Sequence, residues 1–125
     1  MTNKASFDGP IQMVFRKTTE EVEIAGTRIP AGSRVAPVIA SANRDERRFP
    51  DPDRFDVERR PQGHLGFGFG KHFCLGSALA RLEARVALEA LVPELLALRR
   101  ASPERRFVDS FLVRGPERLD LARAA

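Results

Sequence analysis

The chain has a single cysteine, Cys74, among its 125 residues, so it cannot form an internal disulfide. It also lacks a run of about 20 apolar residues, the length that crosses a bilayer. The best candidate, residues 75–98, is interrupted by five charged side chains. The first ten residues lack the apolar stretch of about 7–15 residues that a secretory signal needs. These absences exclude a disulfide scaffold and a membrane span, and they predict a cytoplasmic protein.

Charge of one sign is not concentrated anywhere in the sequence. The 21 Lys and Arg residues exceed the 17 Asp and Glu residues by a net charge of only +4, and the two signs interleave, as in the stretch RDERR at 44–48. Nucleic-acid binders instead gather their basic side chains on one face. The sequence therefore predicts no nucleic-acid partner. The hydrophobic fraction of 42% is enough to predict one globular domain with a sizeable core.

Turn residues and apolar periods divide residues 1–125 into five parts of one α+β domain. Residues 1–42 are predicted to form short antiparallel hairpins, because the apolar run 11–15 and the alternating residues Val22 and Ile24 suggest strands, and turns follow at 25–27 and 30–33. Residues 43–62 carry three prolines and are predicted to form an ordered meander with Phe49, Phe55 and Val57 as apolar anchors.

The second half contains one strongly periodic segment. Leu79, Leu82, Val86 and Ala90 recur at steps of three and four, which predicts a helix over 77–92 that Pro93 ends or kinks. Residues 93–125 return to a period of two, around 111–113 and again at 119–121, with Arg-Gly-Pro between them. This pattern predicts a terminal hairpin.

Residues 63–76 form a loop with five glycines and three phenylalanines in fourteen positions. The loop has neither the Walker spacing nor the G-x-G-x-x-G dinucleotide fingerprint. His64, His72 and Cys74 offer three zinc ligands without the recurring spacing and fourth ligand of a structural site. What remains is a cysteine at the start of a helix, where the helix dipole stabilises a thiolate. Glycines that allow close backbone approach and apolar rings at Phe67 and Phe73 suit a planar metal cofactor.

Residues 67–76 resemble the F-G-x-G-x-H-x-C-x-G loop of the cytochrome P-450 family, the heme-thiolate monooxygenases. Residues 50–56 are similar to the family's meander, 79–83 to the helix behind the heme, and 110–115 to the last hairpin. The resemblance implies the C-terminal, heme-binding part of the P-450 fold.

The resemblance implies that Cys74 is the axial thiolate ligand of the iron of heme b. It places His72 and Arg16 on the heme propionates and the remaining cofactor contacts at Phe67, Gly68, Gly70 and Gly76. The substrate pocket would include Ile11, Met13, Val14, Phe111 and Leu112. Simpler roles remain open: a surface arginine, a solvated histidine, a buried structural thiol and plain core strands.

The family's oxygen-activating helix has no counterpart in these residues, so the resemblance implies no catalytic residue in this portion. In the complete family form it implies oxygen insertion into a small organic substrate, with electrons from a ferredoxin-like or flavin partner. We expect no turnover from the chain alone. The alternatives are a non-catalytic heme-binding or redox-partner module, or a gene remnant. A half-covered heme face would also expose apolar surface and favour self-association.

One family feature is missing from the sequence. Asn3 and Ser6 stand where the family carries the charged pair of its Glu-x-x-Arg helix, which joins the meander arginine in a buried network. Arg54 matches that arginine and would lose its partner, and an unpaired buried charge costs about 3–5 kcal/mol. We therefore predict that Arg54 is exposed or paired with Asp51, Asp53 or Asp56.

Overall fold

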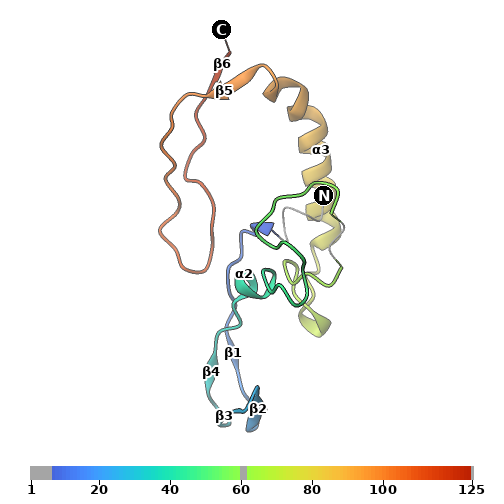
Figure 1. The fold of residues 1–125 in the computed structure, drawn as a ribbon, viewed down its shortest axis with the longest axis vertical. Helices are drawn as coiled ribbons and strands as arrows, with labels where there is room; N and C mark the ends of the chain where they lie inside the picture. Colours follow the sequence, from blue (N-terminus) through green and yellow to red (C-terminus); the bar gives the residue numbers. More distant parts are fainter. Residues whose placement is uncertain (1–6, 60–61, 125) are drawn as a thin grey trace.

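The computed structural model describes residues 7–59 and 62–124, which form an elongated, open arrangement (Figure 1). Short strands at one end lead through a helical turn and an irregular meander to one long helix, and the last two strands lie at the other end. The strands are β1 (Arg16–Lys17), β2 (Val22–Ile24), β3 (Thr27–Ile29), β4 (Arg34–Val35), β5 (Leu98–Arg100) and β6 (Leu121–Arg123). The helices are α2 (Ile39–Ala42), the 3₁₀ turn η1 (Gly70–His72) and α3 (Ser77–Leu95). None of the helices in the described part of the chain is long and apolar enough to cross a membrane.

The N-terminal strands confirm the predicted hairpins. Strands β2 and β3 pair antiparallel around Ala25 and Gly26, whose φ values of 48° and 78° are both left-handed, as a type I′ turn requires. Strands β1 and β4 pair outside this turn, with Arg16 opposite Val35. The predicted strand over 11–15 is wrong, because Ile11 and Met13 make only single bridges to different partners and a continuous ladder starts at Arg16.

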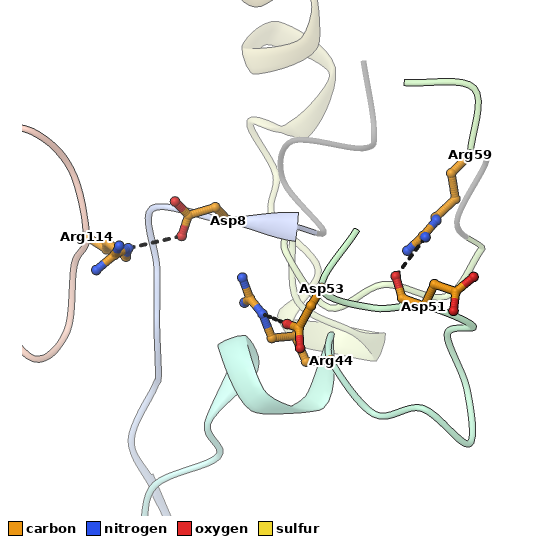
Figure 2. A network of polar contacts seen from close by, with 6 residues as sticks. All are labelled: Asp8, Arg44, Asp51, Asp53, Arg59 and Arg114. Atoms are coloured by element: carbon orange, nitrogen blue, oxygen red, sulfur yellow. Dashed lines mark hydrogen bonds and ion pairs between the residues drawn. The ribbon is translucent and has the colours of Figure 1, made fainter. Parts of the chain in front are cut away.

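The meander is anchored by fewer apolar side chains than the sequence predicts. Phe49 is buried at 8% exposure, whereas Phe55 and Val57 are 54% and 75% exposed. Phe55 packs edge-on against Phe7, with ring centroids 5.4 Å apart. Polar contacts add to this anchoring (Figure 2): Arg44 Nε lies 3.0 Å from Asp53 Oδ1, and Arg59 Nη2 donates to the Asp51 carbonyl at 2.8 Å. Outside the meander, Arg114 Nε lies 3.1 Å from Asp8 Oδ1. Exposed ion pairs such as Arg44–Asp53 and Arg114–Asp8 contribute about 0–1 kcal/mol each.

The prediction for Arg54 is confirmed, since its side chain is exposed. It also lies close enough to Asp56 to favour the charged carboxylate. The pKa of Asp56 is lowered mainly by a hydrogen bond from the backbone N–H of Glu58, with Arg54 among the smaller contributions. Asn3 and Ser6 lie outside the described residues.

Helix α3 is longer than predicted and runs through Pro93 to Leu95. Proline has no N–H to donate, so it forfeits one hydrogen bond, but its fixed φ suits the helix. The pattern resumes beyond it, because the N–H of Leu96 donates to the Val92 carbonyl at 3.3 Å.

A hairpin forms within 93–125 as predicted, but the predicted pairing of 111–113 with 119–121 is wrong. Strand β6 pairs antiparallel with β5, with Leu98 opposite Arg123. Residues 111–113 instead meet the N-terminal segment, where Ile11 bridges Val113 and the N–H of Gln12 donates to the Leu112 carbonyl at 2.8 Å. A period of two predicts an extended segment but does not identify its neighbour, which explains the error.

The expectation of a sizeable core is also wrong. The exposed area is 10312 Å², against about 6,700 Å² for a compact monomer of this mass. The buried residues of the described ranges are Ile39, Asn43, Phe49 and Ser77. Helix α3 carries two apolar stripes, one through Leu79, Leu82 and Val86 and the other through Leu88, Leu91 and Leu95, and all six side chains are exposed. At 3.6 residues per turn the stripes point to different sides of the helix, as in a helix packed between two layers.

Candidate functional site

The loop that holds Cys74 is folded back on itself by backbone hydrogen bonds. The N–H of Gly68 donates to the Leu65 carbonyl at 2.9 Å, and the N–H of Cys74 donates to the Phe67 carbonyl at 2.7 Å. Between Phe67 and Cys74, the N–H of Phe73 donates to the Gly70 carbonyl at 3.0 Å and closes the 3₁₀ turn η1. The loop therefore has a defined shape that ends with Cys74 just before α3.

Two glycines are required by this shape. Gly68 and Gly70 have φ values of 77° and 58°, in the left-handed region that L side chains rarely adopt. A Cβ at Gly68 would also lie 2.6 Å from the carbonyl oxygen of His72, whereas a Cβ at Gly70 would meet nothing within 4 Å. The backbone thus crosses itself closely at Gly68 and only turns at Gly70.

Cys74 presents an exposed thiol at the start of α3, which excludes a buried structural thiol. Gly76 is the N-cap of the helix, and a Cβ there would lie 4.0 Å from the cysteine sulfur. The apolar side chains around the thiol face solvent: Phe69, Phe73 and Leu75 are 81%, 51% and 100% exposed. An exposed thiol among exposed apolar groups at a helix N-terminus fits a flat, apolar group that carries a metal.

The two aromatic rings predicted to face a cofactor, Phe67 and Phe73, differ in burial. Phe67 is half-buried, and the guanidinium carbon of Arg81 lies 4.6 Å from its ring centroid. Phe73 is exposed. His72 lies in η1 and is exposed. Arg16 lies in β1, exposed, and its Nη1 donates to the carbonyl of Phe15 at 2.7 Å.

The residues predicted to line a substrate pocket come from two distant segments that meet in the structure. Residues 11–14 lie along residues 111–113 through the Ile11–Val113 bridge and the Gln12–Leu112 hydrogen bond. Met13 bridges Val38, and the N–H of Val14 donates to the Pro37 carbonyl at 3.2 Å. The rings of Phe15 and Phe111 pack edge-on with centroids 6.4 Å apart. The five predicted residues therefore belong to one region.

Several residues at the loop were not predicted from the sequence. A pocket of about 640 Å³ adjoins it, lined by Arg48, Gln62, Gly63, His64, Leu65, Gly68, Phe69, Phe73 and Arg81. No acidic residue is among these lining residues, so the pocket has a positive charge. Asn43 is buried at the end of α2, and its Oδ1 accepts a hydrogen bond from the N–H of Leu65 at 2.8 Å. In the sequence, Asn43 is only a polar residue that follows a short apolar segment. This pattern does not predict its contact with Leu65, 22 residues further along.

Zinc gains no support from the structure. Within residues 7–59 and 62–124, no group of three or more His, Cys, Asp and Glu side chains is placed to hold a metal ion.

His64 should make stability sensitive to mild acid. Burial lowers its pKa below the usual 6.5, and the charge of Arg81 lowers it further. Its Nδ1 also accepts the N–H of Gly66 at 3.2 Å, which requires that nitrogen to be unprotonated. The stabilising contribution is therefore present above pH 6.5 and is lost as the pH falls through the lower pKa of the folded state. We expect the free energy of unfolding to fall on acidification over this range in denaturant titrations.

The control is His64→Asn, because an asparagine oxygen can accept the same N–H two residues ahead without titrating. This variant should have a flatter dependence of stability on pH than the unsubstituted chain. Equal pH dependence in both chains would contradict the assignment.

The loop, the helix behind it and the meander together match one known family. The family model "Cytochrome P450" matches residues 9–119. The chain belongs to the cytochrome P450 family. The expected family and the C-terminal, mixed helix-and-strand part of its fold are thereby confirmed.

Relatives of this P450 chain include bacterial enzymes. Cytochrome p450 CYP199A2 of Rhodopseudomonas palustris is 46% identical over 115 residues, which covers 92% of this chain and 28% of the relative. The 6-deoxyerythronolide B hydroxylase of Saccharopolyspora erythraea is 52% identical over 89 residues, covering 71% of this chain and 22% of the relative.

Solved P450 structures share the same arrangement. The structure of P450BioI in complex with an acyl carrier protein that carries hexadec-9Z-enoic acid superposes with a TM-score of 0.91 and 38% identity, over 98% of this chain and 32% of that one. This chain thus spans 28% of the length of CYP199A2 and 32% of the P450BioI chain. The open shape is that of the corresponding part of complete P450 folds.

Proposed function

We propose that this chain forms the cysteine-loop portion of a heme-thiolate monooxygenase, with Cys74 as the axial ligand of heme b. The observation that carries the proposal is the exposed thiol of Cys74 at the start of α3, fixed by the 2.7 Å hydrogen bond from its N–H to the Phe67 carbonyl. Family membership supports heme as the cofactor.

The chain's own residues suit this role chemically. The N-terminus of α3 carries partial positive charge, which would stabilise the negative charge of an iron-bound sulfur placed there. Gly68 and Gly70 give the loop its left-handed turns, and Gly76 lets the backbone pass close to the sulfur. The rings of Phe67, half-buried, and Phe73, exposed, would lie against a bound planar cofactor. Bound heme would supply the redox-active iron that activates dioxygen for insertion of one oxygen atom into a substrate.

His72 and Arg16 are the proposed donors to the heme propionates. Arginine offers a planar fork of N–H groups that matches a carboxylate, and histidine adds a second donor. Both side chains are exposed and carry no acidic partner in the described ion pairs. Arg16 uses Nη1 on the Phe15 carbonyl, and its remaining N–H groups and the exposed ring of His72 are available to a carboxylate ligand.

The joined segments 11–14 and 111–112 are the proposed wall of a pocket for a small organic substrate. Their side chains include Ile11, Met13, Val14, Phe111 and Leu112, all apolar, and Ile11 and Phe111 are 41% and 67% exposed. An apolar wall of this kind orients a substrate by shape and by burial.

The positive pocket beside the loop is the proposed docking point for an acidic ferredoxin-like or flavin redox partner. Arg48 and Arg81 supply its fixed charge, and the lowered pKa of His64 keeps that side chain neutral near pH 7. Charge complementarity of this type mainly speeds association.

We propose that monooxygenation requires the rest of the P450 fold and that no catalytic residue lies in this portion. The low burial of α3 and the 28% coverage of CYP199A2 support this division. The alternative is a non-catalytic heme-binding or partner-docking module. The pocket without acidic lining residues favours it, because docking of an acidic partner does not require the rest of the P450 fold.

The test is reconstitution of the purified chain with hemin, followed by reduction and exposure to carbon monoxide. We expect a Soret band at the position of thiolate-ligated iron. Cys74→Ala should abolish this band because alanine offers no ligand, while the control Thr19→Ala, at an exposed residue away from the loop, should keep it.

The outcomes separate the hypotheses. A missing band in the unsubstituted chain, or an unchanged band in Cys74→Ala, would overturn the proposed ligation. A band without substrate oxidation is expected from the chain alone. Turnover on addition of the rest of a P450 fold would favour the enzyme over the non-catalytic module.

A further inference from the structure

We propose that Asn43 is a positioning residue for the cysteine loop: its buried side-chain oxygen holds the N–H of Leu65 and so fixes the register in which the loop presents Cys74. The spectroscopic part of this inference rests on the proposed heme ligation, whereas the part that concerns loop geometry does not.

Asn43 is itself held firmly. It is 6% exposed, and its backbone N–H donates to the carbonyl of Ile39 at 3.0 Å, at the C-terminal end of α2. Ile39 is buried at 9% exposure. The side chain of Asn43 therefore projects from a fixed backbone, so the position of its Oδ1 is defined by α2.

The hydrogen bond from the N–H of Leu65 to Asn43 Oδ1 is 2.8 Å long and joins residues 22 positions apart. Leu65 is half-buried, so its N–H would have little access to water if the oxygen were removed. A second side-chain bond to a loop peptide group, from the Gly66 N–H to His64 Nδ1, is local. Asn43 thus connects the loop to a separate part of the fold.

From Leu65 the loop's own hydrogen bonds continue to the cysteine. The Leu65 carbonyl accepts the N–H of Gly68 at 2.9 Å. The carbonyl of Phe67, the residue before Gly68, accepts the N–H of Cys74 at 2.7 Å. One end of the Leu65 residue is held by Asn43 and the other closes the turn at Gly68. Displacement of Leu65 would therefore move the carbonyl that receives the Cys74 N–H.

The experiment compares amide hydrogen exchange in the unsubstituted chain, Asn43→Leu and Asn43→Asp. Leucine keeps a similar volume without an acceptor, whereas aspartate keeps the acceptor oxygen. We expect Asn43→Leu to speed exchange at Leu65, Gly68 and Cys74 by roughly tenfold or more, the effect of losing one buried acceptor. Asn43→Asp should restore most of the protection. The matched control is Ser41→Ala, at an exposed residue of the same helix.

Amides of hairpin β2–β3, which exchange by local opening away from the cysteine loop, are the reference and should exchange unchanged in Asn43→Leu. Unchanged exchange at Leu65, or acceleration confined to Leu65 without Gly68 and Cys74, would overturn the proposal. If Asn43→Leu unfolds the whole chain, the unsubstituted protein decides: Leu65, Gly68 and Cys74 must then open with one common free energy, and separate values would overturn it.

The spectroscopic readout concerns the state of the ligand. In hemin-reconstituted Asn43→Leu we expect a several-fold smaller share of the thiolate-type Soret band in the carbon monoxide complex, with rescue by Asn43→Asp. An unchanged share would overturn the link from Asn43 to Cys74 while leaving the ligation itself intact. A missing band in the unsubstituted chain would overturn the ligation, and hydrogen exchange would still decide the role of Asn43.

Discussion

Gly68→Ala is expected to destroy the folded loop. The new Cβ would lie 2.6 Å from the carbonyl oxygen of His72, at a residue whose φ is 77°. A left-handed φ costs an alanine about 1–2 kcal/mol, and relieving a backbone overlap costs about 1–3 kcal/mol more. We expect loss of the protection of the Cys74 amide in hydrogen exchange and loss of heme uptake on reconstitution.

Gly70→Ala is the matched control, because φ is 58° there but a Cβ would meet nothing within 4 Å. This variant should lose only the about 1–2 kcal/mol of the left-handed conformation and keep the loop. Equal losses in the two variants would contradict the close crossing at Gly68, since conformation alone would then account for both.

The isolated chain is expected to self-associate through α3. Its exposed area exceeds that of a compact monomer by several times the ~800 Å² that each partner buries in a standard interface. Leu82 and Val86, 54% and 57% exposed, lie on one apolar stripe of the helix. Full burial of such side chains contributes about 1.5–3 kcal/mol each, so Leu82→Glu with Val86→Glu should weaken association at least about a hundredfold. Sedimentation equilibrium over a range of concentrations measures this change.

Arg85→Gln is the control, because Arg85 is exposed on the side of α3 between the two stripes. Its effect on association should be small. Leu88→Glu with Leu91→Glu asks whether the second stripe also takes part. A chain that stays monomeric at its highest soluble concentration would contradict the expectation.

The local features of the fold could be predicted where sequence and structure act over a few residues. The glycine spacing of 67–76 indicated a backbone of unusual dihedrals, and Gly68 and Gly70 have them. The three- and four-residue period predicts the position of α3. The end predicted at Pro93 is too early, because the missing proline N–H removes one hydrogen bond and the backbone stays helical to Leu95.

Long-range partners could not be predicted, because a pattern along one segment carries no information about the other. Residues 111–113 were recognised as extended, yet they pair with the N-terminal segment rather than with 119–121. The contact of Asn43 with Leu65 is hidden for the same reason. Composition likewise predicts a buried core, but the apolar side chains of both α3 stripes are exposed in this portion of the fold.

The meeting of residues 10–14 with 111–114 also sets an order of events during folding. The N–H of Arg114 donates to the Pro10 carbonyl at 2.7 Å, and the N–H of Gln12 donates to the Leu112 carbonyl. Contacts between residues so far apart in sequence require closure of a long loop, which is slow compared with the formation of a helix or a local hairpin. During synthesis the N-terminal segment must also wait until residues 111–114 have left the ribosome. Hairpin β2–β3 and helix α3 can therefore form before residues 10–14 and 111–114 meet.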